Sequence, residues 1–147
     1  MALLFTEGFD NDGLISTLTA QIGAPYPIAA ASGSLPLVAS QLLLGHCFVA
    51  DVLFAADFAG SSGSVQTAAT ALCVITIDQC LAADDPTLDA SWINIGTINV
   101  TGTNVSFVSN GDSSDPFARG DFMRWVAPAS PDATLAALSV ILLGSQV

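Results

Sequence analysis

The amino-acid sequence predicts an all-β protein, built as an antiparallel β-sandwich of eight or nine strands. The clearest support is an alternation of residue types from Cys47 to Phe58, in which every even-numbered position is apolar. A period of two places these side chains on one face of a strand. In addition, short runs rich in β-branched and aromatic residues recur from Trp92 to Val108, with turn signals about every ten residues. This spacing is typical of a sandwich or a jelly roll.

The beginning of the chain is predicted to hold short strands and one long irregular segment. Leu3–Phe9 is expected to be a strand and Asp10–Gly13 a turn, because Asn, Asp and Gly accept the left-handed backbone conformations that turns need. Leu14–Ala20 follows as a second short strand or a connector. Residues 23–36 are dense in Ala, Ser, Gly and Pro, so we expect an extended surface arm or loop there, ordered by its neighbours.

The middle of the chain is predicted to contain longer strands. Leu37–Leu44 and Cys47–Phe58 are expected to form two of them. Val65–Leu81 is expected to carry a strand centred on Leu72–Ile77, which the sequence Asp84-Asp85-Pro86 brings to an end because proline cannot donate to a strand ladder.

Three short strands are predicted next, at Trp92–Ile95, Thr97–Thr101 and Asn104–Val108, with Gly96 and Gly102 between them. Another strand is expected at residues 121–126. Its alternation places one set of large apolar residues on each face: Met123 and Trp125 on one, and Phe122 and Val126 beside Arg124 on the other.

The closing apolar run, residues 133–143, has two interpretations. As a strand, which we favour, it places Leu138, Val140 and Leu142 on one face. As a helix, it would use Ser130 as its N-cap and Gly144 as its C-terminal glycine. The length of 147 residues fits a single domain spanning residues 1–147.

Charge is scarce and one-sided. Charged residues make up 10% of the chain and hydrophobic residues 52%, and there is no lysine. A surface so poor in charge suits a chain surrounded by other protein copies, although a neutral, Ala-rich globular domain is the alternative. The net charge of −11 argues against a nucleic-acid groove and against contact with an acidic membrane surface. Attraction to a basic protein surface stays open.

The sequence lacks the residues that several kinds of catalysis need. His46 is the only histidine, so neither a Ser-His-Asp relay nor a multi-histidine zinc site can be assembled. Asp51 and Asp57 would lie roughly 20 Å apart along one strand, too far for the carboxylate pair of a glycosidase. We therefore expect no catalytic residue, no cofactor and no metal, with a cation in the acidic loop at 112–115 as a weaker alternative.

Three cysteines, Cys47, Cys73 and Cys80, lie in apolar runs without a C-x-x-C pair, and we expect buried free thiols. Trp92, Trp125 and Tyr26 offer flat faces to sugar rings, but tryptophans on sandwich strands are more often core or interface residues.

The two arginines stand against thirteen acids, so each is expected to pair with Asp within the fold or across an interface. The interface candidates are Tyr26, Pro27, Arg119, Arg124 and Trp125.

Phe117–Pro128, followed by Asp132–Leu135 and the run to Gly144, resembles the last hairpin of small β-sandwich proteins from tailed-phage virions. It is also similar in outline to the closing strands of trimeric tumour-necrosis-factor-like and C1q-like jelly rolls. The opening, Leu3–Asp10, resembles the first strand of phage proteins with lectin-like jelly rolls.

The resemblance implies a head decoration, or cement, protein: a non-enzymatic jelly roll that assembles as a homotrimer on a bacteriophage capsid and bridges its coat subunits. The implied partner is the major capsid protein, and the implied location is the capsid surface of a virion assembled in the host cytoplasm. The alternative is a carbohydrate-binding jelly-roll module of a phage tail or fibre. Such a module exposes its tryptophans in a concave site, whereas a cement protein buries them or places them against another subunit.

Overall fold

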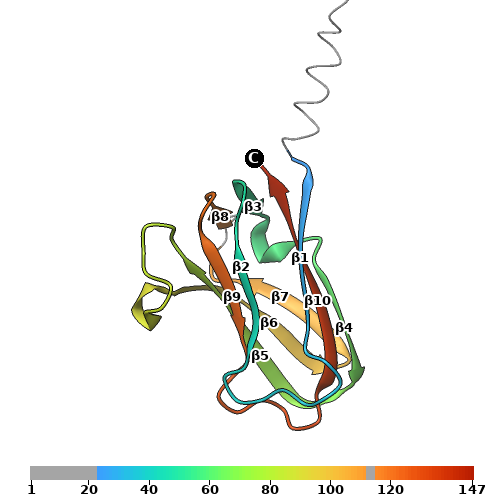
Figure 1. Ribbon diagram of the computed structural model, residues 1–147. Coiled ribbons are helices and arrows are strands. Elements are labelled where there is room, and N and C mark those ends of the chain that lie inside the picture. Colours follow the sequence, from blue (N-terminus) through green and yellow to red (C-terminus); the bar gives the residue numbers. More distant parts are fainter. Residues whose placement is uncertain (1–22, 112–114) are drawn as a thin grey trace, which may run out of the picture.

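The computed structural model describes residues 23–111 and 115–147, which form two five-stranded antiparallel sheets facing each other (Figure 1). The all-β antiparallel sandwich predicted from the sequence is therefore confirmed. Some predicted elements lie outside the described residues: the strand Leu3–Phe9, the turn Asp10–Gly13, the segment Leu14–Ala20 and most of the acidic loop at 112–115.

One sheet is organised around β10 (Ala136–Gln146). On one side, β10 pairs with β1 (Pro25–Ala31) along the whole length of that strand. On the other side it pairs first with β4 (Ser62–Thr67) and then with β3 (Val52–Phe54). The sheet ends at β8 (Asp115–Phe117), which pairs with β3.

The second sheet has the order β2–β9–β5–β6–β7. The edge strand β2 (Leu42–Cys47) pairs with β9 (Phe122–Val126), and β9 pairs with the long central strand β5 (Ala69–Cys80). On the far side of β5 lie β6 (Ile93–Gly102) and β7 (Asn104–Ser109). This sheet carries the candidate site on its outer face.

The described residues form ten strands, where the sequence predicted eight or nine. One reason is that the single strand expected within Val65–Leu81 lies across two strands, β4 and β5, which belong to different sheets. Two single turns of 3-10 helix, η1 (Ala56–Phe58) and η2 (Asp89–Ser91), complete the fold.

The closing apolar run is a strand, as we favoured, and not a helix. Leu138, Val140 and Leu142 are buried, whereas Ser139 and Ile141 between them are exposed. Strands on both sides of β10 form hydrogen bonds with its backbone. Its N–H and C=O groups therefore have partners without the internal hydrogen bonds of a helix.

The extended surface arm or loop predicted at residues 23–36 is in part a regular strand, because seven of these residues form β1. The N–H of Ser32 donates to the carbonyl oxygen of Leu138, so even-numbered residues carry the ladder with β10. Pro25 and Pro27 alternate with them and face the open edge, where an N–H is not needed. Proline is confined to such positions in sheets, and it blunts the edge against further pairing.

Cys47–Phe58 does not form one long strand, and only the last part of Leu37–Leu44 is a strand. The predicted apolar face is nevertheless inside the protein: Phe48, Val52, Phe54 and Phe58 are buried. The chain reaches this arrangement through a turn, the three-residue β3 and η1, where Asp57 and Phe58 adopt positive φ angles of 53° and 50°.

Gly96 does not separate two strands, because β6 runs through it. A Cβ atom at this position would lie 2.5 Å from the carbonyl oxygen of Val108 and 2.6 Å from the ring of Phe58. Glycine is therefore needed here for close approach of η1 to the sheet, and it does not mark a break.

The core between the sheets is rich in aromatic side chains. Phe48 stacks on Phe117 with 4.3 Å between ring centroids, and it also contacts the rings of Tyr26 and Phe54. The largest fully buried side chains are Trp125, Phe48, Phe54, Phe58, Phe117, Ile75, Ile77, Ile98, Met123, Leu135, Leu142 and Val52.

Candidate functional site

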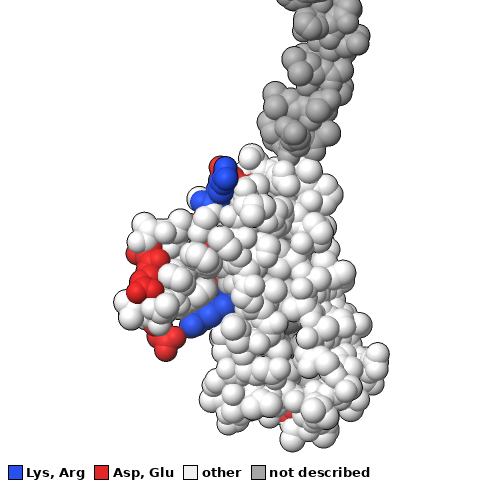
Figure 2. Space-filling view, in the orientation of Figure 1, with Lys and Arg blue, Asp and Glu red and all other residues white. Residues whose placement is uncertain are grey.

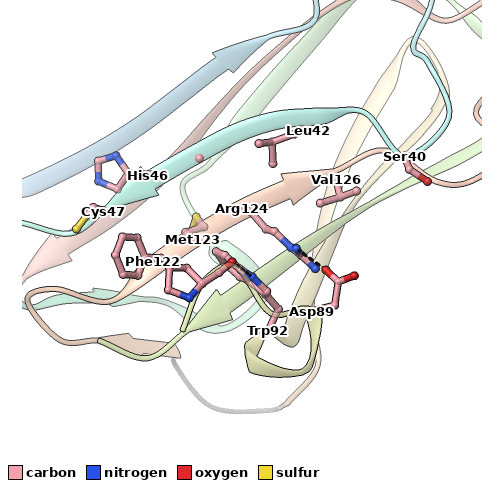
Figure 3. Close-up of a pocket in the computed structure, with 12 residues that line it drawn as sticks. Ser40, Leu42, His46, Cys47, Asp89, Trp92, Phe122, Met123, Arg124 and Val126 are labelled. Carbon is pink, nitrogen blue, oxygen red and sulfur yellow. Dashed lines mark hydrogen bonds and ion pairs between the residues drawn. The ribbon is translucent and has the colours of Figure 1, made fainter. Parts of the chain in front are cut away.

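The strongest candidate site is a groove of about 720 Å³ on the outer face of the second sheet. Strands β2 and β9 form its floor and the connection between β5 and β6 forms its wall (Figure 3). This connection projects from the sandwich in Figure 1. Its lining residues are Ser40, Leu42, Gly45, His46, Cys47, Pro86, Asp89, Trp92, Phe122, Met123, Arg124 and Val126.

The alternation of β9 explains the floor of this groove. Met123 and Trp125 point inward and are buried, so Phe122, Arg124 and Val126 face outward, as the sequence predicted. Strand register then extends the pattern across the sheet.

One outward row is uncharged and crosses all five strands. It consists of residues paired in register: Leu42, Val126, Thr76, Thr97 and Val108. Leu42 and Val108 at its two ends are 60% and 44% exposed. The neighbouring row is polar and consists of Gly45, Arg124, Asp78 and Asn94.

Arg124 joins the floor of the groove to its wall. Its Nε donates to Asp78 Oδ2 at 3.0 Å, and its Nη1 donates to Asp89 Oδ1 at 3.2 Å. The guanidinium carbon lies 4.5 Å from the centre of the Trp92 ring, and Trp92 Nε1 donates to the Pro86 carbonyl oxygen at 3.0 Å (Figure 3). Cation–π and ionic contacts thus anchor the wall to β9.

The wall carries most of the charge visible on this side of the molecule. Acidic atoms gather on the projecting connection, while most of the remaining visible surface is uncharged (Figure 2). Asp84, Asp85 and Asp89 belong to this connection, and all three are exposed. The hydroxyl and N–H of Thr87 donate to Asp85 and lower the pKa of its carboxyl group. Asp85 therefore stays negatively charged at a lower pH than an ordinary aspartate.

His46 points to a corner of the core. Its Nε2 lies 3.1 Å from the Tyr26 hydroxyl, and its ring meets the Phe48 ring edge-on at 4.9 Å. Burial lowers the pKa of His46 and favours the neutral ring. These contacts give His46 a structural role.

The prediction of three buried thiols was wrong for Cys47, which is exposed at the groove because it is the last residue of an edge strand. Cys73 and Cys80 are buried, and burial raises the pKa of both thiols. All three cysteines are free.

The five interface candidates lie in different environments. Arg124 is half-buried in the groove, while Pro27 and Arg119 are exposed elsewhere. Tyr26 is half-buried against Phe48, and Trp125 is 1% exposed inside the core. The groove therefore brings together Arg124 and residues that the sequence did not single out as interface candidates, among them Leu42, Asp89 and Trp92.

Several carboxylates hold the backbone in place. The sequence placed Asp51 and Asp57 on one strand, but in the structure they do not share a strand. Instead, Asp57 Oδ1 accepts the N–H of Ser109 at 3.0 Å. Asp132 accepts from Thr134 and Leu135 through one oxygen and from Thr70 and Ala71 through the other. These bonds, the Thr134 hydroxyl foremost, hold the pKa of Asp132 well below its usual range.

A second hollow, of about 550 Å³, lies on the outer face of the first sheet. It is a trough of uncharged and mostly small residues, in which Ile141 is the large apolar residue that is exposed, at 47%. The trough is lined by Ala29, Ala30, Ala31, Ser62, Gly63, Ser64, Ser139, Val140 and Ile141.

No protein-family model matches the sequence, and a search of curated proteins finds no match either. Within residues 23–111 and 115–147, no three His, Cys, Asp or Glu side chains are grouped so as to hold a metal ion. No helix in that part of the chain is long and apolar enough to cross a bilayer.

Proposed function

We propose that this chain is a non-enzymatic structural protein of a phage virion, of the head decoration type, with its strands connected as a jelly roll. It binds the assembled capsid through the outer face of the β2–β9–β5–β6–β7 sheet and bridges neighbouring coat subunits. The observation that carries the proposal is the uncharged row from Leu42 to Val108 beside the groove.

Such a face suits contact with protein. Large side chains are already exposed on it, so covering them gains hydrophobic free energy at about 25 cal/mol for each Å² of apolar surface removed from water. The rigid sheet holds these side chains in place before binding, which lowers the entropic cost of association. The polar row beside them provides a rim that helps to specify orientation.

The mechanism of stabilisation is thermodynamic linkage. A protein that binds the assembled lattice but not free coat subunits shifts assembly toward the lattice, by about 2.7 kcal/mol per site when its free concentration is a hundred times Kd. Bridging two subunits adds the geometric requirement that both be in place. No chemical reaction is needed.

Self-association as a homotrimer is part of the proposal. The trough on the opposite sheet supports it, because its lining residues carry no charge and most of them are small enough for backbones to approach closely. Native mass spectrometry at tens of micromolar should give a trimer, and Ile141→Asp should shift it to monomer. A monodisperse wild-type monomer contradicts this part of the proposal.

The binding test compares expanded capsids, free coat protein and glycans. The protein should bind expanded capsids alone, and Leu42→Asp should weaken this binding at least tenfold. Val49→Asp is the matched control, because Val49 is 72% exposed but does not line the groove. Equal binding by the two variants would count against the sheet face as the contact surface.

Carbohydrate binding by a tail or fibre module is the second candidate. The observation that favours it is the indole of Trp92 at the groove, beside the Arg124–Asp89 ion pair, since sugar sites combine aromatic faces with charged hydrogen-bonding groups. Glycan binding that Trp92→Ala abolishes, without capsid binding, would favour this function.

A further inference from the structure

The groove combines two kinds of chemistry that define its occupant. Its floor offers apolar contact through Leu42, Phe122 and Val126. Its wall offers negative charge, because the connection spanning residues 81–92 holds three aspartates and neither lysine nor arginine. A ligand that fills the groove therefore meets an apolar surface and an acidic rim together.

The acidic rim is not neutralised by its own arginine. Arg124 is shared between Asp78 and Asp89, so three charges cancel to a remainder of −1 before the other two aspartates of the wall are counted. The side chain of Asp89 is 96% exposed. An exposed carboxylate can accept a further cation from a ligand without losing Arg124.

A second copy of this chain fits the groove poorly. The sequence has two cations against thirteen acids, and one of these cations, Arg124, already lies in the groove. Apart from Arg119, a second copy would bring only neutral or acidic side chains to the rim, and like charges at an interface are unfavourable.

From this charge complementarity, we propose that the groove binds an extended segment of a partner protein in which a large apolar side chain is flanked by Lys or Arg. The apolar side chain packs on Leu42, Phe122 and Val126, and one cation pairs with Asp89 at the groove. Further cations of the segment reach the exposed Asp84 and Asp85, which lie outside the groove on the same connection. The inference rests on the proposed function only for the partner's identity, which would then be a coat subunit.

Labelled synthetic peptides test this recognition directly. The probe is a hexapeptide with a central Leu-Phe pair and two lysines on each side. One matched peptide replaces the lysines with glutamates, and another replaces Leu-Phe with Ser-Ser. By fluorescence anisotropy, the first should bind at least tenfold more tightly than either. Its affinity should fall when NaCl rises from about 0.05 M to about 0.5 M, since added salt screens the pairs at the rim.

Variants locate the binding surface. Asp84→Asn with Asp85→Asn should weaken binding of the lysine peptide roughly five-fold, as expected from losing two exposed ion pairs. Leu42→Asp should weaken it further. Asp57→Asn is the matched control, because the amide oxygen can still accept from Ser109 while one charge is removed at the opposite edge of the sheet, where η1 meets β7. It should leave binding unchanged.

The outcomes separate this inference from the proposed function. Capsid binding that is unaffected by the groove variants, together with no peptide binding, overturns the inference and leaves the decoration function standing, but through a different contact surface. Peptide binding with the expected variant effects but no capsid binding supports the inference and removes the decoration function. Equal affinity for the lysine and glutamate peptides overturns the inference. It is also overturned if the protein binds no peptide but binds a glycan, and Trp92→Ala abolishes the glycan binding.

Discussion

Replacing Phe48 by alanine should destabilise the protein severely. Phe48 is 1% exposed and lies where the two sheets meet, against the rings of Tyr26, Phe54 and Phe117. Truncating a buried Phe to Ala costs about 3–5 kcal/mol, because transfer free energy is lost and a cavity remains. Contact with three aromatic neighbours keeps this site away from the lower end of that range, at about 4 kcal/mol.

That loss is a large fraction of the free energy of unfolding of a typical domain, which is about 5–15 kcal/mol. The assay is guanidinium unfolding followed by tryptophan fluorescence, which the buried Trp125 should report. Phe48→Leu keeps most of the volume and should cost about 1–2 kcal/mol. Leu72→Ala, at a residue 60% exposed, is the surface control and should change the free energy of unfolding by less than about 0.5 kcal/mol.

A second readout makes the reasoning sharper. His46 packs edge-on against Phe48, and burial lowers its pKa, so removing the ring should let water in and move the pKa of His46 back toward 6.5. His46 is the only histidine, so its imidazole resonance can be followed by NMR without ambiguity. A loss below about 2 kcal/mol in Phe48→Ala, with an unmoved His46 pKa, would refute the role assigned to this cluster.

Three other predictions concern stability. Folding lowers the pKa of His46, so the unfolded state binds more protons than the folded state as pH drops below 6.5. The free energy of unfolding should therefore fall as pH drops through this value, and His46→Gln should remove this pH dependence in urea titrations. Asp132→Ala should lower Tm at neutral pH through its lost hydrogen bonds, and the difference from wild type should shrink progressively as pH falls from 3.8 toward the depressed pKa of the folded state, because the unfolded chain takes up the proton first. Gly96→Ala should cost about 1–3 kcal/mol because the new Cβ meets the backbone of β7, whereas Gly45→Ala, with no atom within 4 Å of the new Cβ, should be near neutral by thermal unfolding.

Patterns of local alternation predicted much of the fold. The two faces of β9 and the burial of Leu138, Val140 and Leu142 followed from a period of two, which depends only on neighbours in the chain. The same rule predicted the burial of Phe48 and Phe58 but not the breaks between them. Those breaks depend on positive φ angles that tertiary packing stabilises in η1.

Features that depend on distant pairing could not be predicted. Residues 25–31 have the composition of a loop, and they form a strand because β10, more than a hundred residues later, satisfies their backbone. The groove depends in the same way on the register of β9 with β2 and β5. The residues that form it, Leu42, Arg124 and Trp92, lie in three separate segments. The shortage of cations marked Arg124 and the aromatic ring marked Trp92, but no signal in the sequence placed the two together or marked Leu42.

The pairing of β1 with β10 also sets a delay in biosynthesis. Pro25 and Ser145 are register partners 120 residues apart, the difference between 145 and 25. At translation rates of about 5–20 residues per second, the nascent β1 waits roughly 6–24 s for its partner strand. An unpaired strand in a crowded cell is a template for aggregation during that interval. The two prolines on the open edge of β1 shorten the row of N–H groups that another nascent chain could bind, so they protect the polypeptide before the sandwich exists.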